Sequence, residues 1–268
     1  AFLVDSYKGK VVCNDLLGYS LFIVFFPQLI AGPIVHFNEV ASRLFADIPL
    51  NRLFRNIGVG LTVFLIGLFK KVVIADTMAV PSDTVFAALA AGQVLTPAES
   101  WLGVTAFYLQ IYFDFSAYSD MAIGLAYMVG VKLPLNFNSP FKAVNVAEFW
   151  NRWHMTLTRF LKLHVMLPLL DFMGKRFGKK RMFYVHLQLS FAMLVTMFFV
   201  GLWHGASWSF VVWGTYNGLG MVVYHIWKLA SGKLGDRVRL PGRIAIVLSW
   251  LLTYITVVIG IAFFRSDT

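Results

Sequence analysis

Apolar residues gather along this chain in long segments, and the short stretches between them carry most of the charge. A helix that crosses a lipid bilayer needs about 20 mainly apolar residues. Segments of suitable length cover residues 16–35, 57–80, 101–131, 184–203, 208–227 and 244–264. The sequence therefore predicts an all-α, polytopic transmembrane protein. Because no internal repeat or linker is visible, it also predicts one membrane-embedded domain over residues 1–268.

Two of these segments depart from a simple spanning helix. Residues 16–35 contain Pro27 and the pair Gly32-Pro33. Such interruptions are tolerated at membrane depth only where protein or a water-filled cavity surrounds the backbone. Residues 101–131 are long enough to tilt or break.

Because the chain starts without Met and ends just after an apolar segment, we expect it to lack the amino- and carboxyl-terminal portions of a longer protein.

Composition excludes a water-soluble fold. Hydrophobic residues make up 59% of the 268 positions and charged residues only 13%, whereas soluble domains have roughly 45–50% and about 25%. Too few polar side chains would remain to cover a soluble core of this size. Lipid removes the problem, because it covers an apolar exterior.

The net charge of +10 comes from short basic loops and not from one basic face. Basic loops favour the cytoplasmic side of a membrane. Residues 36–56, 171–183 and 228–243 are therefore predicted to be cytoplasmic, and residues 81–100, which carry few charges, to lie outside. A nucleic-acid partner would require a solvated basic surface, so this pattern predicts none.

Residues 134–168 form neither a clean span nor a soluble loop. Asn145 is a plausible helix cap, with Glu148 reaching back from the third position, and Glu148 with Arg152 forms a favourable i,i+4 pair. Aromatic, apolar and histidine residues then recur at helical spacing: Trp150, Trp153, His154, Leu157, Phe160, Leu161 and His164. We predict one amphipathic helix, interfacial or re-entrant, at or inside the membrane.

The first candidate for chemistry is His204, between two apolar segments. Polar residues in such positions are functional candidates, and a histidine can act as a general base near neutral pH. Gly205 permits close approach of a backbone or substrate, and Trp203 and Trp208 would exclude water. An interfacial histidine in a tight turn between two helices explains the same residues equally well.

A second histidine, His154, shares a helical stripe with Trp150 and Trp153. It could be a packed histidine whose ring nitrogens are satisfied by neighbours. It could also join His204 in acid–base chemistry, although the spacing does not bring the two together.

Asp114 and Asp120 lie in an apolar segment, where carboxylates must pair or accept hydrogen bonds to stay charged. We favour a structural role over direct catalysis, with Arg152 or Lys132 as counter-ions. If the protein were a transporter instead, the two carboxylates would line an ion path. That function predicts two matched broken helices, and the sequence shows no such symmetry.

Several separated motifs agree in order with one known family. They are Phe26-Pro27-Gln28-Leu29-Ile30-Ala31-Gly32-Pro33-Ile34, residues 112–120, Asn136-Phe137-Asn138-Ser139-Pro140-Phe141, residues 149–154 and Trp203-His204-Gly205. Over about residues 1–230 the chain resembles the bacterial membrane-bound O-acyltransferase family, in the branch of alginate O-acetylation and teichoic-acid D-alanylation proteins.

The resemblance implies that His204 matches the family's catalytic histidine and His154 its second histidine. The candidate substrate-binding residues are Trp203, Trp150, Arg152, Asn151, Asp114 and Asp120. One motif departs from the family, since Lys162-Leu163-His164 stands where many members have Arg-Asp-Tyr. That departure leaves the choice of acceptor or partner open.

The function implied is transfer of an acyl group, with acetyl favoured, to a hydroxyl of an exported polysaccharide, either directly or through a partner protein. The donor would be a cytoplasmic thioester, either acetyl-CoA or an acyl-carrier thioester, and an extracytoplasmic acyltransferase partner is expected. Such a protein would lie in the inner membrane as a multi-pass protein. We expect no bound cofactor and no metal site, because the histidines lack ligand spacing and Cys13 is the single cysteine. The same fold could instead transfer D-alanine from a carrier protein, or acylate a lipid or a protein.

Overall fold

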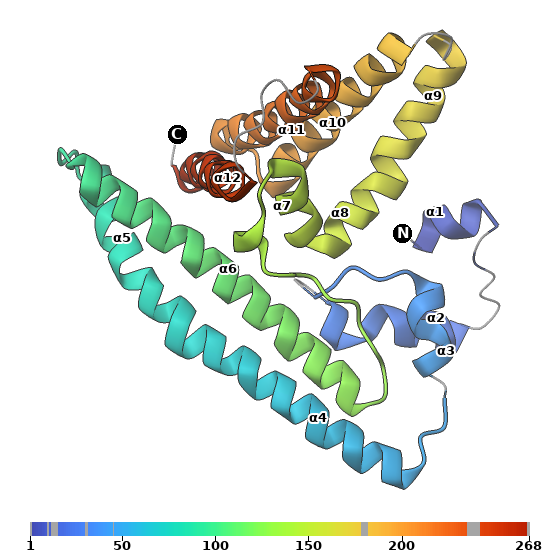
Figure 1. Ribbon diagram of the computed structural model, residues 1–268. Coiled ribbons are helices and arrows are strands. Elements are labelled where there is room, and N and C mark those ends of the chain that lie inside the picture. The colour runs from blue at the N-terminus through green and yellow to red at the C-terminus, as the bar shows by residue number, and fades with distance from the viewer. Residues whose placement is uncertain are drawn as a thin grey trace. The chain divides into compact units, whose positions relative to one another are not determined.

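The computed structural model (Figure 1) describes residues 2–9, 11, 16–29, 32–44, 46–177, 182–234 and 242–266. Within these ranges every regular element is a helix and no strand occurs, which confirms the predicted all-α class. Several residues used in the sequence analysis lie outside the described part of the chain. These are Cys13, Ile30, Ala31 and the basic residues Lys179, Lys180, Arg181, Arg237 and Arg239.

The chain divides into two compact units, Ala1–Phe137 and Asn138–Thr268. Each unit is described by itself below. That the whole chain forms one domain stays a prediction.

The first unit begins with short helices and not with a membrane span. They are α1 (Phe2–Tyr7), α2 (Leu16–Val24), the 3₁₀ turn η1 (Phe26–Gln28) and α3 (Phe37–Leu44). The candidate segment 16–35 is therefore interrupted, as Pro27 and Gly32-Pro33 indicated, because α2 ends at Val24 before η1 begins. Pro27 occupies the first turn of η1, because a proline lacks the N–H that a continuing α-helix would need. The apolar side chains of these helices pack with Val131 and Leu133 in one core cluster.

Two long helical runs make up the rest of this unit and lie side by side (Figure 1). A continuous helical run consists of α4 (Leu50–Phe69), the π-helical turn η2 (Lys70–Ala75) and α5 (Asp76–Ala90). This run packs against α6 (Pro97–Met128). Helix α6 is unbroken, although the length of segment 101–131 is compatible with a break. Thr96 caps α6 in a capping box with Glu99, and the Thr96 hydroxyl lowers the pKa of that carboxyl.

Glycines bring α4 and α6 into close contact. A β-carbon added at Gly60 would lie 2.5 Å from the carbonyl oxygen of Gly124, and one added at Gly67 would lie 2.8 Å from that of Ala117. Small residues of this kind let helix backbones approach closely where lipid supplies no hydrophobic driving force.

The second unit contains short helices followed by three long ones. Its elements are η3 (Pro140–Lys142), α7 (Val146–Arg152), α8 (Met155–Leu161), η4 (Lys162–Met166), α9 (Leu167–Phe177), α10 (Met182–His204), α11 (Trp208–Leu234) and α12 (Gly242–Arg265). Helices α10 and α11 form a tight hairpin, because a β-carbon at Gly201 would lie 2.2 Å from the carbonyl oxygen of Phe210.

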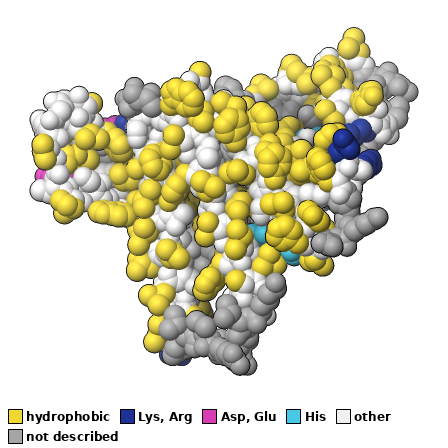
Figure 2. Space-filling view, turned by 90° about the horizontal axis from the view of Figure 1, so that it is seen from above, with side chains coloured by type: hydrophobic (Ala, Val, Ile, Leu, Met, Phe, Trp, Pro, Cys, Tyr) yellow, Lys and Arg dark blue, Asp and Glu magenta, His cyan; other side chains and the backbone are white. Residues whose placement is uncertain are grey.

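By length and composition, the helical segments Leu50–Ala90, Met182–His204 and Gly242–Arg265 are able to cross a membrane. The other long predicted spans form α6 and α11. Large apolar side chains are exposed along α4 and α12, among them Leu65, Ile66, Val247 and Leu252. Figure 2 shows hydrophobic side chains spread across the visible face. Soluble monomers rarely expose so many large apolar side chains, and together with the three helical segments long and apolar enough to span a bilayer this identifies a membrane protein.

Replacing Gly60 by Ala should destabilise the protein by about 1–3 kcal/mol, because the new methyl group would collide with the Gly124 backbone. Gly58 on the same helix has nothing within 4 Å of the corresponding position. Gly58→Ala should therefore be neutral or slightly stabilising, since alanine is the better helix former. Thermal unfolding of the full-length protein in detergent compares the two variants. A Gly60→Ala protein as stable as the wild type would contradict the close packing of α4 on α6.

Candidate functional site

The predicted single amphipathic helix is in fact two helices, and they meet at His154. Helix α7 ends at Arg152 and α8 begins at Met155. His154 adopts a left-handed conformation with φ 42° and ψ 54°, which no residue inside an α-helix can adopt. The Thr158 hydroxyl donates a hydrogen bond of 3.1 Å to the carbonyl of Trp150 across this break. The prediction was wrong here because its helical periodicity ran through a residue whose backbone turns the other way.

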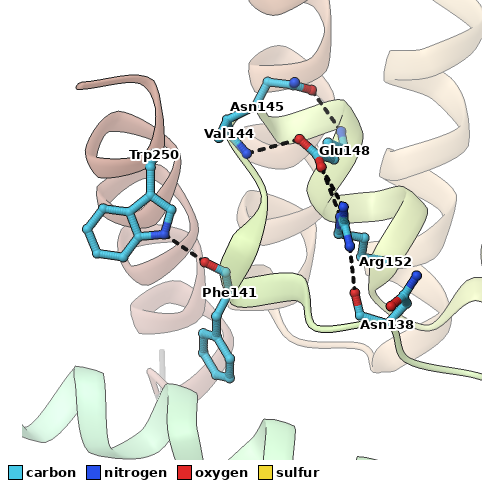
Figure 3. Close-up of polar contacts among 7 residues, drawn as sticks. All are labelled: Asn138, Phe141, Val144, Asn145, Glu148, Arg152 and Trp250. Carbon is cyan, nitrogen blue, oxygen red and sulfur yellow. Dashed lines mark hydrogen bonds and ion pairs between the residues drawn. The ribbon is translucent and has the colours of Figure 1, made fainter. Parts of the chain in front are cut away.

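A network of polar contacts fixes α7 (Figure 3). As predicted, the Asn145 side chain caps the helix by accepting a hydrogen bond of 2.8 Å from the Glu148 N–H. Glu148 reaches back as expected, but it accepts from the N–H of Val144, at 3.1 Å. Its other oxygen pairs with Arg152 at 2.8 Å. The Val144 N–H, and then Arg152, lower the pKa of the Glu148 carboxyl.

Arg152 also ties α7 to the segment before it. Its Nη1 donates to the carbonyl of Asn138 at 3.1 Å, and the Asn138 N–H donates back to the Arg152 carbonyl at 2.9 Å. From α12, the indole of Trp250 donates to the carbonyl of Phe141 at 2.7 Å (Figure 3). The guanidinium of Arg152 is thus occupied by structural contacts.

Aromatic rings from three helices surround His204, at the end of α10. Ring centroids lie 4.9 Å away for Trp203, 5.1 Å for Trp213 and 5.1 Å for Phe264, and 6.1 Å for Phe210. Trp203 is exposed at 65%, so it forms the outer side of this cage. The rings cover the imidazole in part, and His204 itself is half-buried.

The two candidate histidines lie within electrostatic reach of each other. His154 is only 7% exposed. Its burial, together with the repulsion by His204, lowers the pKa of His154 well below its ordinary value. The His154 ring is therefore neutral at physiological pH and can donate from one ring nitrogen and accept at the other. The sequence did not show whether His154 and His204 lie near each other. In the structure both belong to the second unit, and they are close enough to interact electrostatically.

A pocket of about 230 Å³ lies next to this cage. Its walls come from α7, α8, η4, α10 and α11, and its lining residues are Ala147, Trp150, Asn151, Leu157, Thr158, Leu161, Lys162, Met166, Met193, Thr196, Met197, Val200 and Met221. Val200 precedes His204 by one helical turn. Trp150 packs its ring against Trp213, at 5.9 Å, and Trp213 contacts His204. The pocket and the histidine cage thus share a wall.

Asp114 and Asp120 belong to the first unit, where both carboxylates pair with lysines. Lys70 contacts Asp120 at 2.5 Å, and Lys71 contacts Asp114 at 2.6 Å and Asp76 at 2.9 Å. The expected ion pairing is confirmed, but the counter-ions considered from the sequence, Arg152 and Lys132, were the wrong ones. Both lysines begin the π-helical turn η2, and no sequence pattern had linked them to α6.

Sequence reasoning also missed part of the site itself. Trp213 and Phe264 reach His204 from α11 and α12, and no motif pointed to them. A signal for the pocket was present on α10, where Met193, Met197 and Val200 recur at helical spacing. That stripe cannot be distinguished from ordinary core packing without the neighbouring helices.

Comparison with known proteins finds a matching family. The model of the family described as MBOAT, membrane-bound O-acyltransferase, matches residues 4–259. The chain is 42% identical over 254 residues to a peptidoglycan O-acetyltransferase of Helicobacter pylori, a match that covers 94% of this chain and 44% of that protein.

More distant relatives carry other names. A probable alginate O-acetylase AlgI of Pseudomonas aeruginosa is 34% identical over 268 residues, covering 100% of this chain and 46% of the relative. A teichoic acid D-alanyltransferase of Streptococcus thermophilus is 29% identical over 232 residues, covering 84% and 54%. The chain thus spans about half the length of the curated relatives it matches.

Glu148→Ala should lower the stability of the full-length protein by about 1–3 kcal/mol, because the Val144 N–H and Arg152 would lose their acceptor. Asp171→Ala is the matched control. Its i,i+4 pair with Lys175 joins side chains that are 58% and 77% exposed, so its loss should cost about 0.5 kcal/mol or less.

Thermal unfolding in detergent measures both variants. Because the pKa of Glu148 is lowered, its contribution should be complete at neutral pH and should disappear as the pH falls through that lowered pKa. Equal losses for the two variants would argue against a special role of the Glu148 network.

Proposed function

Because the chain belongs to the membrane-bound O-acyltransferase family, we propose that the full protein transfers an acyl group, with acetyl favoured, to a hydroxyl of an exported cell-envelope polysaccharide. The donor is a thioester on the cytoplasmic side, acetyl-CoA or an acyl-carrier thioester. The protein is a multi-pass protein of the inner membrane and works with an extracytoplasmic acyltransferase partner. Support for the acceptor comes from relatives named for peptidoglycan and alginate.

The observation that carries the proposal is the aromatic cage around His204, which shares a wall with an apolar pocket. A half-buried imidazole such as that of His204 can act as a general base towards a hydroxyl. A pocket one helical turn away can hold the acyl donor, so that the two reactants meet in a fixed orientation.

The reaction requires a single transfer step at the thioester carbonyl. A ring nitrogen of His204 accepts the proton of the acceptor hydroxyl while that oxygen bonds to the carbonyl carbon. The tetrahedral intermediate then collapses as the carbon–sulfur bond breaks, and the proton passes to the departing thiolate. The products are an acyl ester and a free thiol, and no metal or resident cofactor takes part.

His154 is proposed to orient the donor or to stabilise the oxyanion of the intermediate, since its neutral ring can donate one hydrogen bond. Asn151 is better suited to assist than Arg152. Asn151 is an exposed residue of the pocket wall, whereas the guanidinium of Arg152 already binds Glu148 and Asn138. Trp203 shields the imidazole on its outer side.

Asp114 and Asp120 serve a different purpose in this proposal. Their ion pairs with Lys71 and Lys70 hold α6 against the preceding helical run, which agrees with the structural role favoured from the sequence. Direct contact with substrate is not needed to explain them.

A second candidate function is transfer of D-alanine from a carrier protein. It is favoured by one observation, the 29% identity to a teichoic acid D-alanyltransferase. The chemistry at His204 would be the same, because an aminoacyl thioester reacts with a hydroxyl in the same way. Only the acyl group and the acceptor would differ.

His204→Ala and His154→Ala should each lower acetyl transfer in membranes that contain the full-length protein, for His204 by about 100-fold or more. His225→Ala on α11 is the control and should keep normal transfer. The measurement follows label from radioactive acetyl-CoA into exported polysaccharide, at equal protein levels. Full transfer by a normally folded His204→Ala protein would refute the proposed mechanism. Label from a D-alanyl carrier, but not from acetyl-CoA, would favour the second candidate.

A further inference from the structure

Two histidines lie beside each other across the hairpin of α10 and α11. His186 is on α10 and His225 on α11, and the centroids of their rings are 5.2 Å apart. Further along the hairpin, Gly218 lies against the backbone of Leu194, and the same antiparallel register brings position 186 level with position 225. No spacing in the sequence signals this pair, because the two residues meet only through the packing of the helices.

One nitrogen of each ring is buried without a partner. These atoms are Nδ1 of His186 and Nε2 of His225, and neither has a hydrogen-bond partner among the described residues. Buried polar atoms in native structures almost always have one. Both side chains are nevertheless only partly buried, so a small ligand can reach the rings. A ligand that binds both imidazoles at once would satisfy the two atoms together.

The spacing of the two rings fits a shared metal ion. A histidine nitrogen binds zinc at about 2.0–2.1 Å, so two imidazoles on one tetrahedral ion have their centroids about 5 Å apart. The observed separation of 5.2 Å agrees with that value. Rotation of each ring about its Cβ–Cγ bond, which is a broad torsion, directs one nitrogen towards the ion. The backbones of the two helices can therefore stay where they are.

The donor atoms select the class of metal. Neither α10 nor α11 contains an aspartate, a glutamate or a cysteine. Imidazole suits zinc, copper and nickel, whereas magnesium and calcium prefer carboxylate and carbonyl oxygens. A pair of imidazoles without a neighbouring carboxylate on either helix therefore favours a transition metal over magnesium or calcium.

The position of the pair separates it from the acyl-transfer site. His186 lies near the beginning of α10 and His204 ends that helix, so the two are about 27 Å apart at 1.5 Å per residue. The loops next to the pair, residues 171–183 and 228–243, are those predicted to be cytoplasmic. An ion held here would be too distant to take part in chemistry at His204.

From these contacts we propose that His186 and His225 form a binding site for a divalent transition metal such as Zn²⁺, which links α10 to α11. The inference does not depend on the proposed function. Water completes the coordination, because both rings are partly exposed. With half the protein ligands of a full structural zinc site, about half of its binding free energy remains, which corresponds to a Kd on the order of 10 μM.

Titration of Zn²⁺ into the full-length protein, purified in detergent without a histidine tag and freed of metal by a chelator, tests the proposal by calorimetry. His186→Ala and His225→Ala should each weaken zinc binding by about 10-fold or more, because each removes one of the two protein ligands. The double variant should be little worse than either single one, since both residues hold the same ion.

A nearby charge supplies a variant with the opposite effect. The exposed ammonium of Lys228 lies within electrostatic reach of the His225 ring, and it repels a bound cation. Lys228→Gln should therefore tighten zinc binding by about 2-fold. Tyr224→Phe, beside His225 in the sequence, keeps both imidazoles and should bind zinc like the wild type. Mg²⁺ should bind much more weakly than Zn²⁺ to all of these proteins.

Two further measurements distinguish metal binding from ordinary packing of the two rings. Zinc should raise the unfolding temperature of the wild type and not that of the single variants. With Cu²⁺ in place of zinc, electron paramagnetic resonance should report two bound nitrogens in the wild type and one in each single variant. Acyl transfer by His225→Ala should stay normal, so a failure of the proposed function leaves this test intact.

No saturable zinc binding by the wild type, wild-type affinity in either single variant, or equal binding of Mg²⁺ and Zn²⁺ would each overturn the proposal. Loss of zinc binding in both single variants, together with the change from two bound nitrogens to one, would establish the site.

Discussion

Polar groups in this mostly apolar protein must find their partners within the protein, because lipid offers neither hydrogen bonds nor counter-ions. The first unit meets this constraint with the ion pairs of Lys70 with Asp120 and of Lys71 with Asp114. In the second unit, Arg152 shares its guanidinium between a carboxylate of its own helix and a carbonyl of the preceding segment. The lysine pairs fix α6 against the helical run beside it, whereas Arg152 fixes α7 to the segment before it.

Close helix packing then brings the candidate site together. Gly201 and Gly214 allow the backbones of α10 and α11 to touch, and this contact carries Trp213 to the ring of His204. The left-handed turn at His154 ends α7 and redirects the chain into α8, so that one short segment supplies both a buried histidine and part of the pocket wall. The cage around His204 is therefore a product of backbone geometry as much as of its aromatic residues.

Much of this could be predicted from the sequence, and the failures have physical causes. Apolar length identified the long helices, and the Asn145 cap with the Glu148–Arg152 pair follows from local spacing. The break at His154 could not be predicted, because a stripe of apolar residues reports side-chain periodicity and not the sign of φ. The lysine partners of the two aspartates, like the rings that reach His204 from α11 and α12, depend on helix packing between residues that are distant in sequence.

Buried polar atoms that keep no partner mark the limit of this rule. Trp150 Nε1 is one of several such atoms among the described residues, together with Gln28 Oε1, Ser82 Oγ and Gln110 Oε1. The Trp150 ring packs edge-to-face against Phe149 and Trp213, and Trp213 also contacts the ring of His204. The aromatic packing in the pocket wall is therefore continuous with the cage around His204, so the shape of the pocket and the placement of the imidazole depend on the same rings.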